Sequence, residues 1–317
     1  MNTKSFKQPR RQSLIREIWD FTGPGFRSAR KRFEAQSWST DKHIVLTGAT
    51  SGLGLSAAKT LAAAGATLTL VVRDEKKGGA LKLECETLGA AGCQVIVADM
   101  ALLVDARHVI DVLLEQNIPI DVLINNAGAL FNTRAETAEG LEQSTSLLLL
   151  SPIMLMQGLK PLLQASKSAR VVNVVSGGMY TQRLSMSWLR SGFAHRYDGP
   201  AVYAQAKRAL AIVTEEWHQE WAKHGVYLNT THPGWADTPG VQTALPTFRR
   251  WTQWILRSPD EGADTIVWMA VSSELDRVSG CLFLDRQARR YYLNKKTQER
   301  PTDRRALLSY INEYVSF

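Results

Sequence analysis

The chain has 317 residues, of which 44% are hydrophobic and 21% are charged. This size and balance are typical of a globular protein with one well-buried core. The formal net charge is +8, but residues 1–40 contain nine Lys or Arg and only three acidic residues. Because the basic residues gather in an appendage, the composition argues against a nucleic-acid-binding body.

The cysteines and the apolar segments indicate the cellular compartment of the protein. Cys85, Cys93 and Cys281 form no close pair along the sequence and lack metal-ligand spacing, so we expect reduced thiols and no metal site. The most apolar stretch, 147–163, contains Lys160 and falls short of the ~20 residues that span a bilayer. No signal peptide is visible. We expect a cytoplasmic protein, and the basic N-terminal sequence leaves a mitochondrial transit peptide as an alternative.

Short β-branched or apolar runs alternate with helical patterns from residue 43 onward. The helical patterns include 52–64, 102–115 and 203–223. This alternation is typical of crossover units and a parallel sheet. We therefore predict an α/β fold, a single Rossmann-type doubly wound sheet of about seven strands with helices on both faces. The predicted strands are 43–47, 67–72, 94–98, 121–125, 170–175, 226–231 and 280–284.

Two long segments interrupt this alternation. Residues 177–202 and 233–258 are rich in Trp, Tyr and Phe, and each follows a predicted strand. Loops at the carboxyl ends of strands are where an α/β sheet usually builds a ligand pocket. The alternative is that the aromatic side chains only pack these loops onto the body.

A glycine cluster lies between the first predicted strand and the first predicted helix. Gly48, Gly52 and Gly54, with Ser51 and Leu53 between them, have the spacing Gly-x-x-x-Gly-x-Gly. Glycines here permit a tight turn, a close approach of pyrophosphate to the backbone, and close helix–strand packing. The helix N-terminus then offers free N–H groups to phosphates. The cluster predicts a dinucleotide site.

The end of the second predicted strand indicates which dinucleotide binds. An acidic residue at this position usually binds the ribose of NAD. Here Arg73 comes first and Asp74 follows it. A guanidinium suits the 2′-phosphate of NADP, and a charge-assisted bond is worth ~1.5–3 kcal/mol. We therefore predict NADP(H) as the cofactor, with Asp74 facing away.

A Tyr-x-x-x-Lys pair opens the predicted helix 203–223. Tyr203 and Lys207 lie four residues apart, so they share one helical face. The same pattern occurs twice more, at Tyr291 and Tyr292, but in a charged C-terminal segment. We expect the ammonium, together with a cationic nicotinamide ring, to lower the pKa of the Tyr203 phenol from its usual value near ~10. Tyr203 could then serve as general acid and base.

A hydroxyl follows the fifth predicted strand. Ser176 ends that run, and two glycines after it leave space for a ligand. An isolated serine at a strand end is usually a turn residue. Together with Tyr203 and Lys207, Ser176 instead predicts a catalytic set in which its hydroxyl holds the substrate oxygen.

These motifs, in this order, resemble the short-chain dehydrogenase/reductase superfamily. Residues 125–128 read Asn-Asn-Ala-Gly, as the family does after its fourth strand. Segments 21–33, 174–179, 232–240 and 262–265 are also similar to the subgroup named dehydrogenase/reductase family member 12. The resemblance implies that further residues bind the cofactor: Asp99, Met100, Asn126, Ala127, Gly128, Tyr203, Lys207, Pro233, Gly234 and Thr238.

One position departs from the family pattern. The superfamily usually places an Asn in the helix after Asn-Asn-Ala-Gly, where it holds a water that relays protons to the lysine. Counting without gaps from Asn125 and Gly140 puts Leu148 at that position. Leucine cannot bind a water. The alternative to an active enzyme is therefore a catalytically weak NADP-binding scaffold or regulatory protein.

The sequence thus predicts an NADP-dependent oxidoreductase. It would transfer a hydride between nicotinamide and a carbonyl or alcohol of a lipophilic small molecule. Residues 41–286 would form the NADP-binding catalytic domain, 1–40 a basic N-terminal extension, and 287–317 a basic, helical tail.

The extension also carries an apolar stripe. Its members lie among Arg10, Arg11 and Arg16: Leu14, Ile15, Ile18, Trp19 and Phe21. Such a pattern is typical of a helix at an acidic membrane surface, which predicts peripheral membrane contact through residues 1–38. The alternative is a helix packed on the enzyme or on a partner subunit. The sequence leaves the oligomeric state open.

Overall fold

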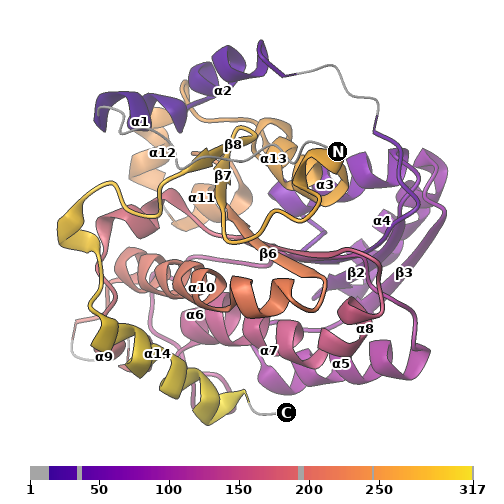
Figure 1. The fold of residues 1–317 in the computed structure, drawn as a ribbon. Helices are drawn as coiled ribbons and strands as arrows, with labels where there is room; N and C mark the ends of the chain where they lie inside the picture. Colours follow the sequence, from indigo (N-terminus) through magenta and orange to yellow (C-terminus); the bar gives the residue numbers. More distant parts are fainter. Residues whose placement is uncertain (1–13, 34–37, 192–195, 245, 316–317) are drawn as a thin grey trace.

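The computed structural model describes residues 14–33, 38–191, 196–244 and 246–315. Arg10 and Arg11 of the predicted basic stripe lie outside the described residues, as do the side chains of Leu14 and Ile15. Within the described ranges an eight-stranded sheet is enclosed between helices (Figure 1).

The sheet confirms the predicted Rossmann-type arrangement. Its order is β3-β2-β1-β4-β5-β6-β7-β8, and the pairings from β3 to β7 are parallel. Since β1 lies between β2 and β4, the chain winds in opposite directions from it, and the carboxyl ends of the strands diverge there. The parallel strands are β1 (His43–Thr47), β2 (Thr67–Val72), β3 (Gly92–Val97), β4 (Val122–Asn125), β5 (Ala169–Val174), β6 (Val226–Thr231) and β7 (Leu282–Leu284).

An eighth strand adds to the seven that were predicted. β8 (Gln287–Arg289) pairs antiparallel with β7. The two residues between them, Asp285 and Arg286, have φ of 53° and 56°, as a tight two-residue hairpin turn requires. The sequence pattern missed β8 because Gln-Ala-Arg carries no apolar alternation.

Helices cover both faces of the sheet, as predicted. Successive residues of a strand point to opposite faces, so Ile44 and Leu46 join one core while Val45 joins the other. The first core packs beneath α3 (Gly52–Ala63), α4 (Glu75–Leu88) and α13 (Pro259–Val271), and the second beneath α5 (Leu103–Gln116), α7 (Ser151–Gly158) and α10 (Gly199–Ala222). Shorter helices lie between the longer elements: α6 (Gln143–Thr145), the π-helix η1 (Ser146–Leu150), α8 (Lys160–Gln164), η2 (Gly177–Thr181), α9 (Met186–Ser191), α11 (Pro239–Ala244), α12 (Pro246–Thr252), η3 (Ser273–Leu275) and η4 (Lys295–Thr297). A further long helix, α14 (Pro301–Tyr314), follows η4.

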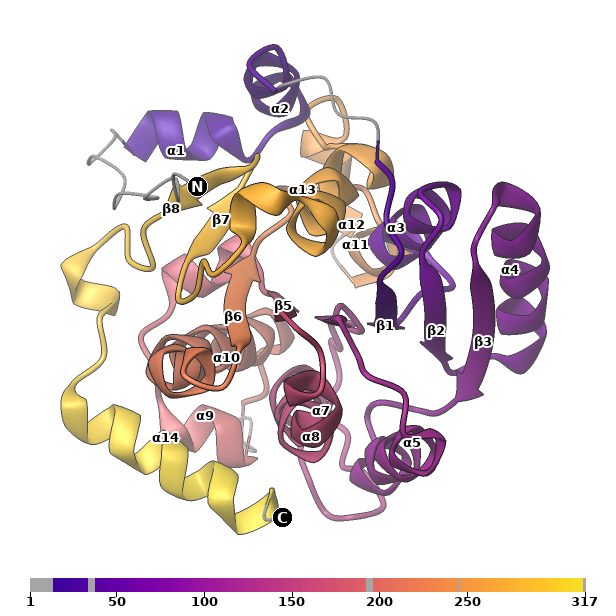
Figure 2. The same ribbon diagram turned by 45° about the vertical axis from the view of Figure 1, so that its right-hand side comes forward.

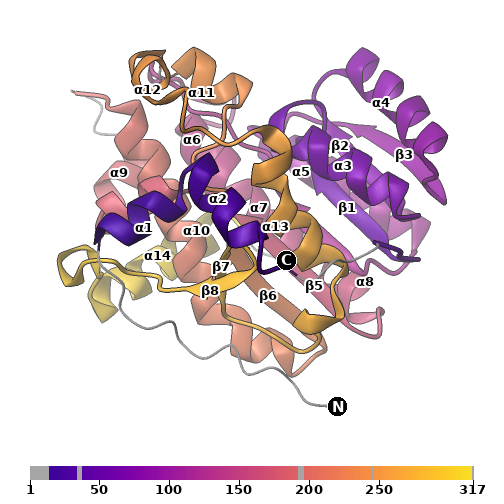
Figure 3. The same cartoon turned by 90° about the horizontal axis from the view of Figure 1, so that it is seen from above.

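The N-terminal extension packs against the body. Helix α1 (Leu14–Asp20) lies beside β8, and α2 (Gly23–Arg30) lies beside α13 (Figures 2 and 3). The Glu17 carboxylate pairs with Arg290 at 2.9 Å, and Asp20 pairs with Arg289 at 2.8 Å. The structure therefore supports the packed-helix alternative for this segment. No helix among the described residues is long and apolar enough to cross a membrane.

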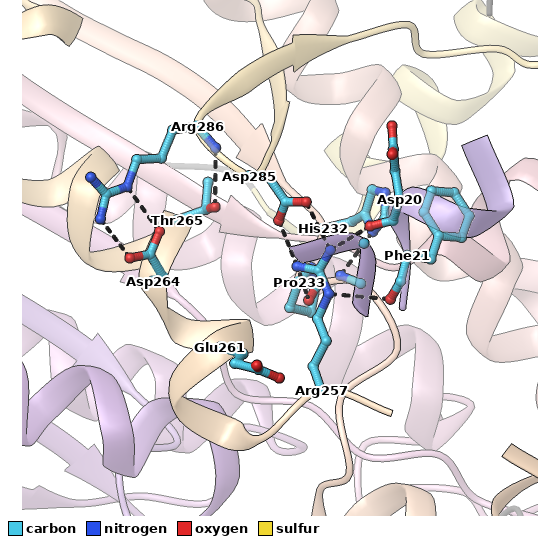
Figure 4. A network of polar contacts seen from close by, with 12 residues as sticks. Asp20, Phe21, His232, Pro233, Arg257, Glu261, Asp264, Thr265, Asp285 and Arg286 are labelled. Atoms are coloured by element: carbon cyan, nitrogen blue, oxygen red, sulfur yellow. Dashed lines mark hydrogen bonds and ion pairs between the residues drawn. The ribbon is translucent and has the colours of Figure 1, made fainter. Parts of the chain in front are cut away.

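One buried arginine joins the extension to the sheet (Figure 4). The Arg257 and Asp285 side chains are each 1% exposed and form a two-pronged ion pair, with distances of 2.6 and 2.9 Å. Arg257 also donates to the carbonyls of Asp20, Phe21 and Pro233. All five of its N–H donors are thereby used.

Cys85 and Cys93 are free thiols, as expected, but they lie next to each other in the fold. Eight positions separate them along the chain, yet their thiols hydrogen-bond to each other. The packing of α4 on β3 explains this contact, because Cys85 lies in α4 and Cys93 in β3. The hydrogen bond raises the pKa of the Cys85 thiol and lowers that of Cys93.

We expect Asp285→Asn to destabilise the fold by about 3–5 kcal/mol, because it leaves the Arg257 charge buried without a counter-charge. Urea unfolding measures this cost. The double variant Arg257→Met/Asp285→Leu should lose less than the sum of the two single variants. As a control, Arg27→Met breaks an ion pair whose arginine is 57% exposed and should cost less than about 1 kcal/mol. If Asp285→Asn and Arg27→Met reduce the free energy of unfolding by the same small amount, the buried Arg257–Asp285 pair does not hold the extension to the sheet as we describe.

Candidate active site

A cleft of about 400 Å³ lies at the carboxyl ends of the strands. A second pocket of about 300 Å³ adjoins it, and the two share Tyr203 and Pro233 as wall residues. Of the residues predicted to bind the cofactor, the cleft is lined by Gly48, Ser51, Gly52, Leu53, Gly54, Arg73, Asp99, Met100, Asn126, Ala127, Gly128, Tyr203, Lys207, Pro233 and Thr238. Gly234 lines only the second pocket, together with Ser176.

The glycine loop lets neighbouring groups come close to its backbone. A Cβ on Gly54 would collide with the carbonyl of Gly48, so any larger residue would push α3 away from β1. The Asn126 amide donates to the carbonyls of Thr47 and Gly48 at 2.9 and 3.2 Å and braces the loop. Ser51, the residue before α3, makes no capping side-chain bond, so the first N–H groups of that helix have no cap there. This arrangement fits a pyrophosphate group.

Two cationic side chains, Arg73 and Lys77, border the cleft. The exposed Arg73 has no ion pair among the described residues. Asp74 also borders the cleft, but its carboxylate accepts a hydrogen bond from the backbone of Lys77 at 3.0 Å and so caps α4. That bond lowers the pKa of Asp74. The sequence analysis missed Lys77 at this edge, although its place in the first turn after Asp74 was a usable signal.

The end of β3 carries the segment that the family resemblance assigns to the adenine. The backbone N–H of Asp99 donates to Asp105 at 2.7 Å, and the Asp99 carboxylate accepts from the N–H of Ala101 at 2.9 Å. These bonds fix the direction of the chain at Asp99 and Met100. Both residues then face the cleft.

Helix α10 positions the Tyr-x-x-x-Lys pair. The helix begins at Gly199 and is capped by Asp198, so Tyr203 lies in its second turn. The sequence analysis had placed Tyr203 at the start of this helix. The Ser176 hydroxyl, at the end of the fifth strand, accepts from Gly178 at 3.2 Å and hydrogen-bonds to the Tyr203 phenol. By contrast, Tyr291 hydrogen-bonds to Thr230 at 3.3 Å and lines neither pocket.

Burial controls the proton affinities of this pair. It raises the pKa of the Tyr203 phenol, and the hydrogen bond from Ser176 only partly opposes that rise. Lys207 does not contribute to this shift, and the lowering expected from the ammonium together with a cationic nicotinamide ring stays a prediction. Burial lowers the pKa of Lys207 to about 7. Its ammonium donates to the Val174 carbonyl at 2.7 Å, its one hydrogen bond to a described residue.

Leu148 lies next to the lysine. It is fully buried in the π-helix η1. A Cβ built on Gly128 would lie 3.1 Å from Leu148 Cδ2 and 3.7 Å from Lys207 Nζ, so both side chains border the same small space. A π-turn within a helix is rare and often marks a functional position. The methyl groups of Leu148 give the Lys207 ammonium no acceptor.

The second pocket has mainly apolar walls. They come from both long loops, as expected, and include Pro200, Trp235 and Leu256. Trp251 and Trp254 do not line it and are 81% and 84% exposed. Phe193 and the side chain of Phe248 lie outside the described residues. An apolar pocket that is also lined by Ser176 and Tyr203 can orient a carbonyl or alcohol oxygen.

Known proteins share both this sequence and this fold. The family model described as short chain dehydrogenase matches residues 42–247. Dehydrogenase/reductase SDR family member 12 of Homo sapiens is 36% identical over 84% of this chain and 85% of its own length. The same protein of Bos taurus is 32% identical over 93% of each chain. Polyprenol dehydrogenase of Homo sapiens is 31% identical over 82% of each.

Solved structures agree at the level of the fold. L-sorbose reductase from Gluconobacter frateurii, complexed with NADPH and L-sorbose, superposes with a TM-score of 0.63 at 21% identity. The match covers 77% of this chain and 95% of the reductase. The family match, the relatives and the arrangement of the cleft lead to one conclusion: the chain belongs to the short-chain dehydrogenase/reductase family of oxidoreductases, and it resembles the member 12 subgroup.

Proposed function

We propose that this protein is an NADP-dependent oxidoreductase that interconverts a carbonyl and an alcohol on a lipophilic small molecule. The observation that carries the proposal is the position of Tyr203, which lines both the cleft and the apolar pocket. Ser176 hydrogen-bonds to its phenol, and Lys207 lies one helical turn away on the same helix. Residues 41–286 would form the NADP-binding catalytic domain, with 1–40 as the basic N-terminal extension and 287–317 as the basic, helical tail.

The side chains of the site divide the chemistry among themselves. When bound, NADPH would supply a hydride to the carbonyl carbon. The Ser176 hydroxyl would donate a hydrogen bond to the carbonyl oxygen and hold it beside Tyr203. The Tyr203 phenol would give its proton to that oxygen as the alcohol forms, and in the reverse direction it would accept the proton. The Lys207 ammonium would stabilise the resulting phenolate.

The walls of the second pocket support a lipophilic substrate. Pro200, Trp235 and Leu256 offer apolar surface, and apolar side chains make up most of the lining. Among the relatives are polyprenol dehydrogenase and retinol dehydrogenase 11 of Homo sapiens, the latter 30% identical over 77% of each chain. Both names describe alcohols with long apolar chains.

Tyr203→Phe tests the proposal. We expect kcat to fall by about 10²–10⁴-fold, because only the transferable proton is lost, while the Kd for NADPH changes by less than about threefold. NADPH oxidation with an aldehyde panel and direct NADPH titration give the two readings. Tyr291→Phe, the same substitution in a competing Tyr-x-x-x-Lys pair, should leave kcat near wild type. A Tyr203→Phe protein that keeps more than about a tenth of the wild-type kcat would remove Tyr203 from this role.

The choice of NADP over NAD rests on Arg73. Its guanidinium borders the cleft without an ion pair among the described residues, while Asp74 is held by the cap of α4. We expect Arg73→Ala to weaken NADPH binding about tenfold or more and NADH binding by less than about twofold, because only NADPH carries the 2′-phosphate. Titration of each cofactor measures this ratio. Equal losses for both would show that Arg73 binds something else.

The alternative function is a catalytically weak NADP-binding scaffold. The observation that favours it is Leu148, which leaves the Lys207 ammonium with one described acceptor, the Val174 carbonyl. Without a relay, the proton that leaves Tyr203 would be replaced slowly. Tight NADPH binding without turnover on any carbonyl would support this second function.

Leu148→Asn separates slow proton resupply from other limits. If the missing amide limits turnover, kcat should rise by roughly tenfold with little change in the Kd for NADPH. The amide also costs ~1–3 kcal/mol where it stays unpaired, so the melting temperature must be measured alongside. Leu149→Asn, in the same buried helix, should show that cost without the gain in kcat. A stable Leu148→Asn protein with unchanged kcat would exclude a missing relay as the limit.

The dependence of the melting temperature on pH is a second measurement that tests Leu148→Asn. Burial holds the pKa of Lys207 near 7 in the folded protein, against 10.5 in the unfolded chain. Between these values the unfolded chain binds more protons, so this lysine makes the fold more stable as pH rises. In Leu148→Asn, an introduced amide oxygen that accepts from the ammonium would raise the folded pKa. The rise in melting temperature between pH ~7 and ~10 should then be smaller in Leu148→Asn than in wild type.

A peripheral, cytoplasmic location at an acidic membrane surface extends the proposal. Ile18 and Trp19 remain 41% and 48% exposed on α1. Gly23 donates to the Ile255 carbonyl, which brings the start of α2 next to the segment that carries the exposed Trp254. Tryptophan favours the membrane interface.

Sedimentation with phosphatidylserine vesicles tests the membrane contact. We expect the full chain to bind, and removal of residues 1–11 combined with Trp19→Ser to weaken binding about tenfold or more, because both charge and apolar area are lost. Phosphatidylcholine vesicles are the control for charge. Unchanged binding of the shortened variant would rule out this contact.

A further inference from the structure

A third chamber, larger than the other two, adjoins the apolar pocket. Its volume is about 1050 Å³. It shares Gly178 and Trp235 with the pocket that contains Ser176 and Tyr203, so the two spaces meet at those residues. The proposed chemistry does not use this chamber, and its remaining walls come from α1, η2 and the chain after β8.

The inner walls of the chamber are aromatic. The Tyr180 hydroxyl donates to the Arg290 carbonyl at 2.8 Å, and the Tyr292 hydroxyl bonds to Glu299 at 2.6 Å. With both hydroxyls engaged, the two tyrosines offer mainly their rings to a ligand. Phe21 stacks on Tyr180 with ring centroids 6.1 Å apart, and Leu293 completes an apolar lining. Such walls suit a hydrocarbon chain.

Part of the chamber lining is basic. Arg290 lines it, but its charge is matched by Glu17. Lys295 and Lys296 also line it, are exposed, and have no ion pair among the described residues. Two ammonium groups without an ion pair in the lining of an otherwise apolar chamber suit an anionic group.

The N-terminal extension forms part of these walls. Ile18 and Phe21 line the chamber, and a Cβ on Gly177 would lie 3.4 Å from the Phe21 ring. The ion pair between Asp20 and Arg289 and the donation from Arg257 to the Phe21 carbonyl hold this segment in place. The docked extension therefore supplies one wall of the chamber.

We propose that the chamber receives the far part of the substrate, an apolar chain that ends in a carboxylate or phosphate held by Lys295 and Lys296. This assignment rests on the proposed function, since it places the reacting oxygen at Ser176 and Tyr203. Gly178 lies where the chain would pass, and it leaves space because it has no side chain. The substrate class is thus a long-chain aldehyde, ketone or alcohol with an anionic far end.

Steady-state kinetics with matched aldehydes test the assignment. Hexanal, dodecanal and the ω-carboxylate analogue of dodecanal are each reduced with saturating NADPH. We expect kcat/KM to rise by about tenfold or more from hexanal to dodecanal, and again by about tenfold for the carboxylate analogue, because chain burial and charge pairing add in turn. Equal kcat/KM for dodecanal and its carboxylate analogue would overturn the anionic end.

Two double variants locate the charge. Lys295→Ala/Lys296→Ala should raise KM for the carboxylate analogue about tenfold and leave both KM for dodecanal and kcat unchanged. Lys31→Ala/Lys167→Ala removes the same charge from exposed positions that do not line the chamber, and it should change nothing. Equal effects of the two double variants would mean that the net charge acts, and not the chamber.

A binding measurement separates this inference from the proposed function. Calorimetric titration of dodecanedioate into the NADP-saturated protein does not depend on turnover. If no aldehyde is reduced but dodecanedioate binds, and Lys295→Ala/Lys296→Ala weakens it about tenfold, the chamber stands while the proposed activity fails. If aldehydes are reduced but dodecanedioate binds equally well to the wild type and to Lys295→Ala/Lys296→Ala, the proposed activity stands and the chamber assignment fails.

Discussion

The arrangement of the substrate side of this protein depends on one buried ion pair, Arg257 with Asp285. A guanidinium desolvated to this extent is tolerated only when every donor is matched, and here all five are. Its partners come from three parts of the chain: the extension, the loop after β6, and the β7–β8 turn (Figure 4). The pair therefore fixes the relative positions of segments that no continuous strand or helix connects.

That constraint makes the N-terminal extension part of the site. Phe21 packs edge-on against His232, with ring centroids 4.6 Å apart, and its carbonyl accepts from the Trp235 backbone at 2.8 Å. A segment whose composition indicated a surface appendage thus supports the loop that borders the apolar pocket. Gly234 belongs to the same arrangement: its φ of 75° is open to glycine, and a Cβ there would collide with Arg257.

The catalytic residues differ from Arg257, because their burial lowers the stability of the fold and serves function instead. Lys207 is 3% exposed and has one described acceptor, so burial costs the fold free energy that nothing nearby returns. Burial also raises the pKa of Tyr203, which favours the protonated phenol that can serve as a proton donor. Groups left short of partners in this way are typical of functional sites, where a bound ligand completes the set.

The sequence by itself determined the doubly wound sheet, the glycine loop, the Arg73 edge and the Ser176, Tyr203 and Lys207 set, because each depends on local patterns at strand ends or along one helical face. It did not predict β8, the Cys85–Cys93 contact, or the aromatic chamber with its two lysines, and it left the docking of α1 and α2 as one of two alternatives. Two of them join residues that are far apart along the chain: the docked extension pairs Asp20 with Arg289, and the chamber brings Phe21 next to Trp235. Only tertiary packing decided them, because long-range ion pairs and ring contacts leave no periodic signal in the sequence.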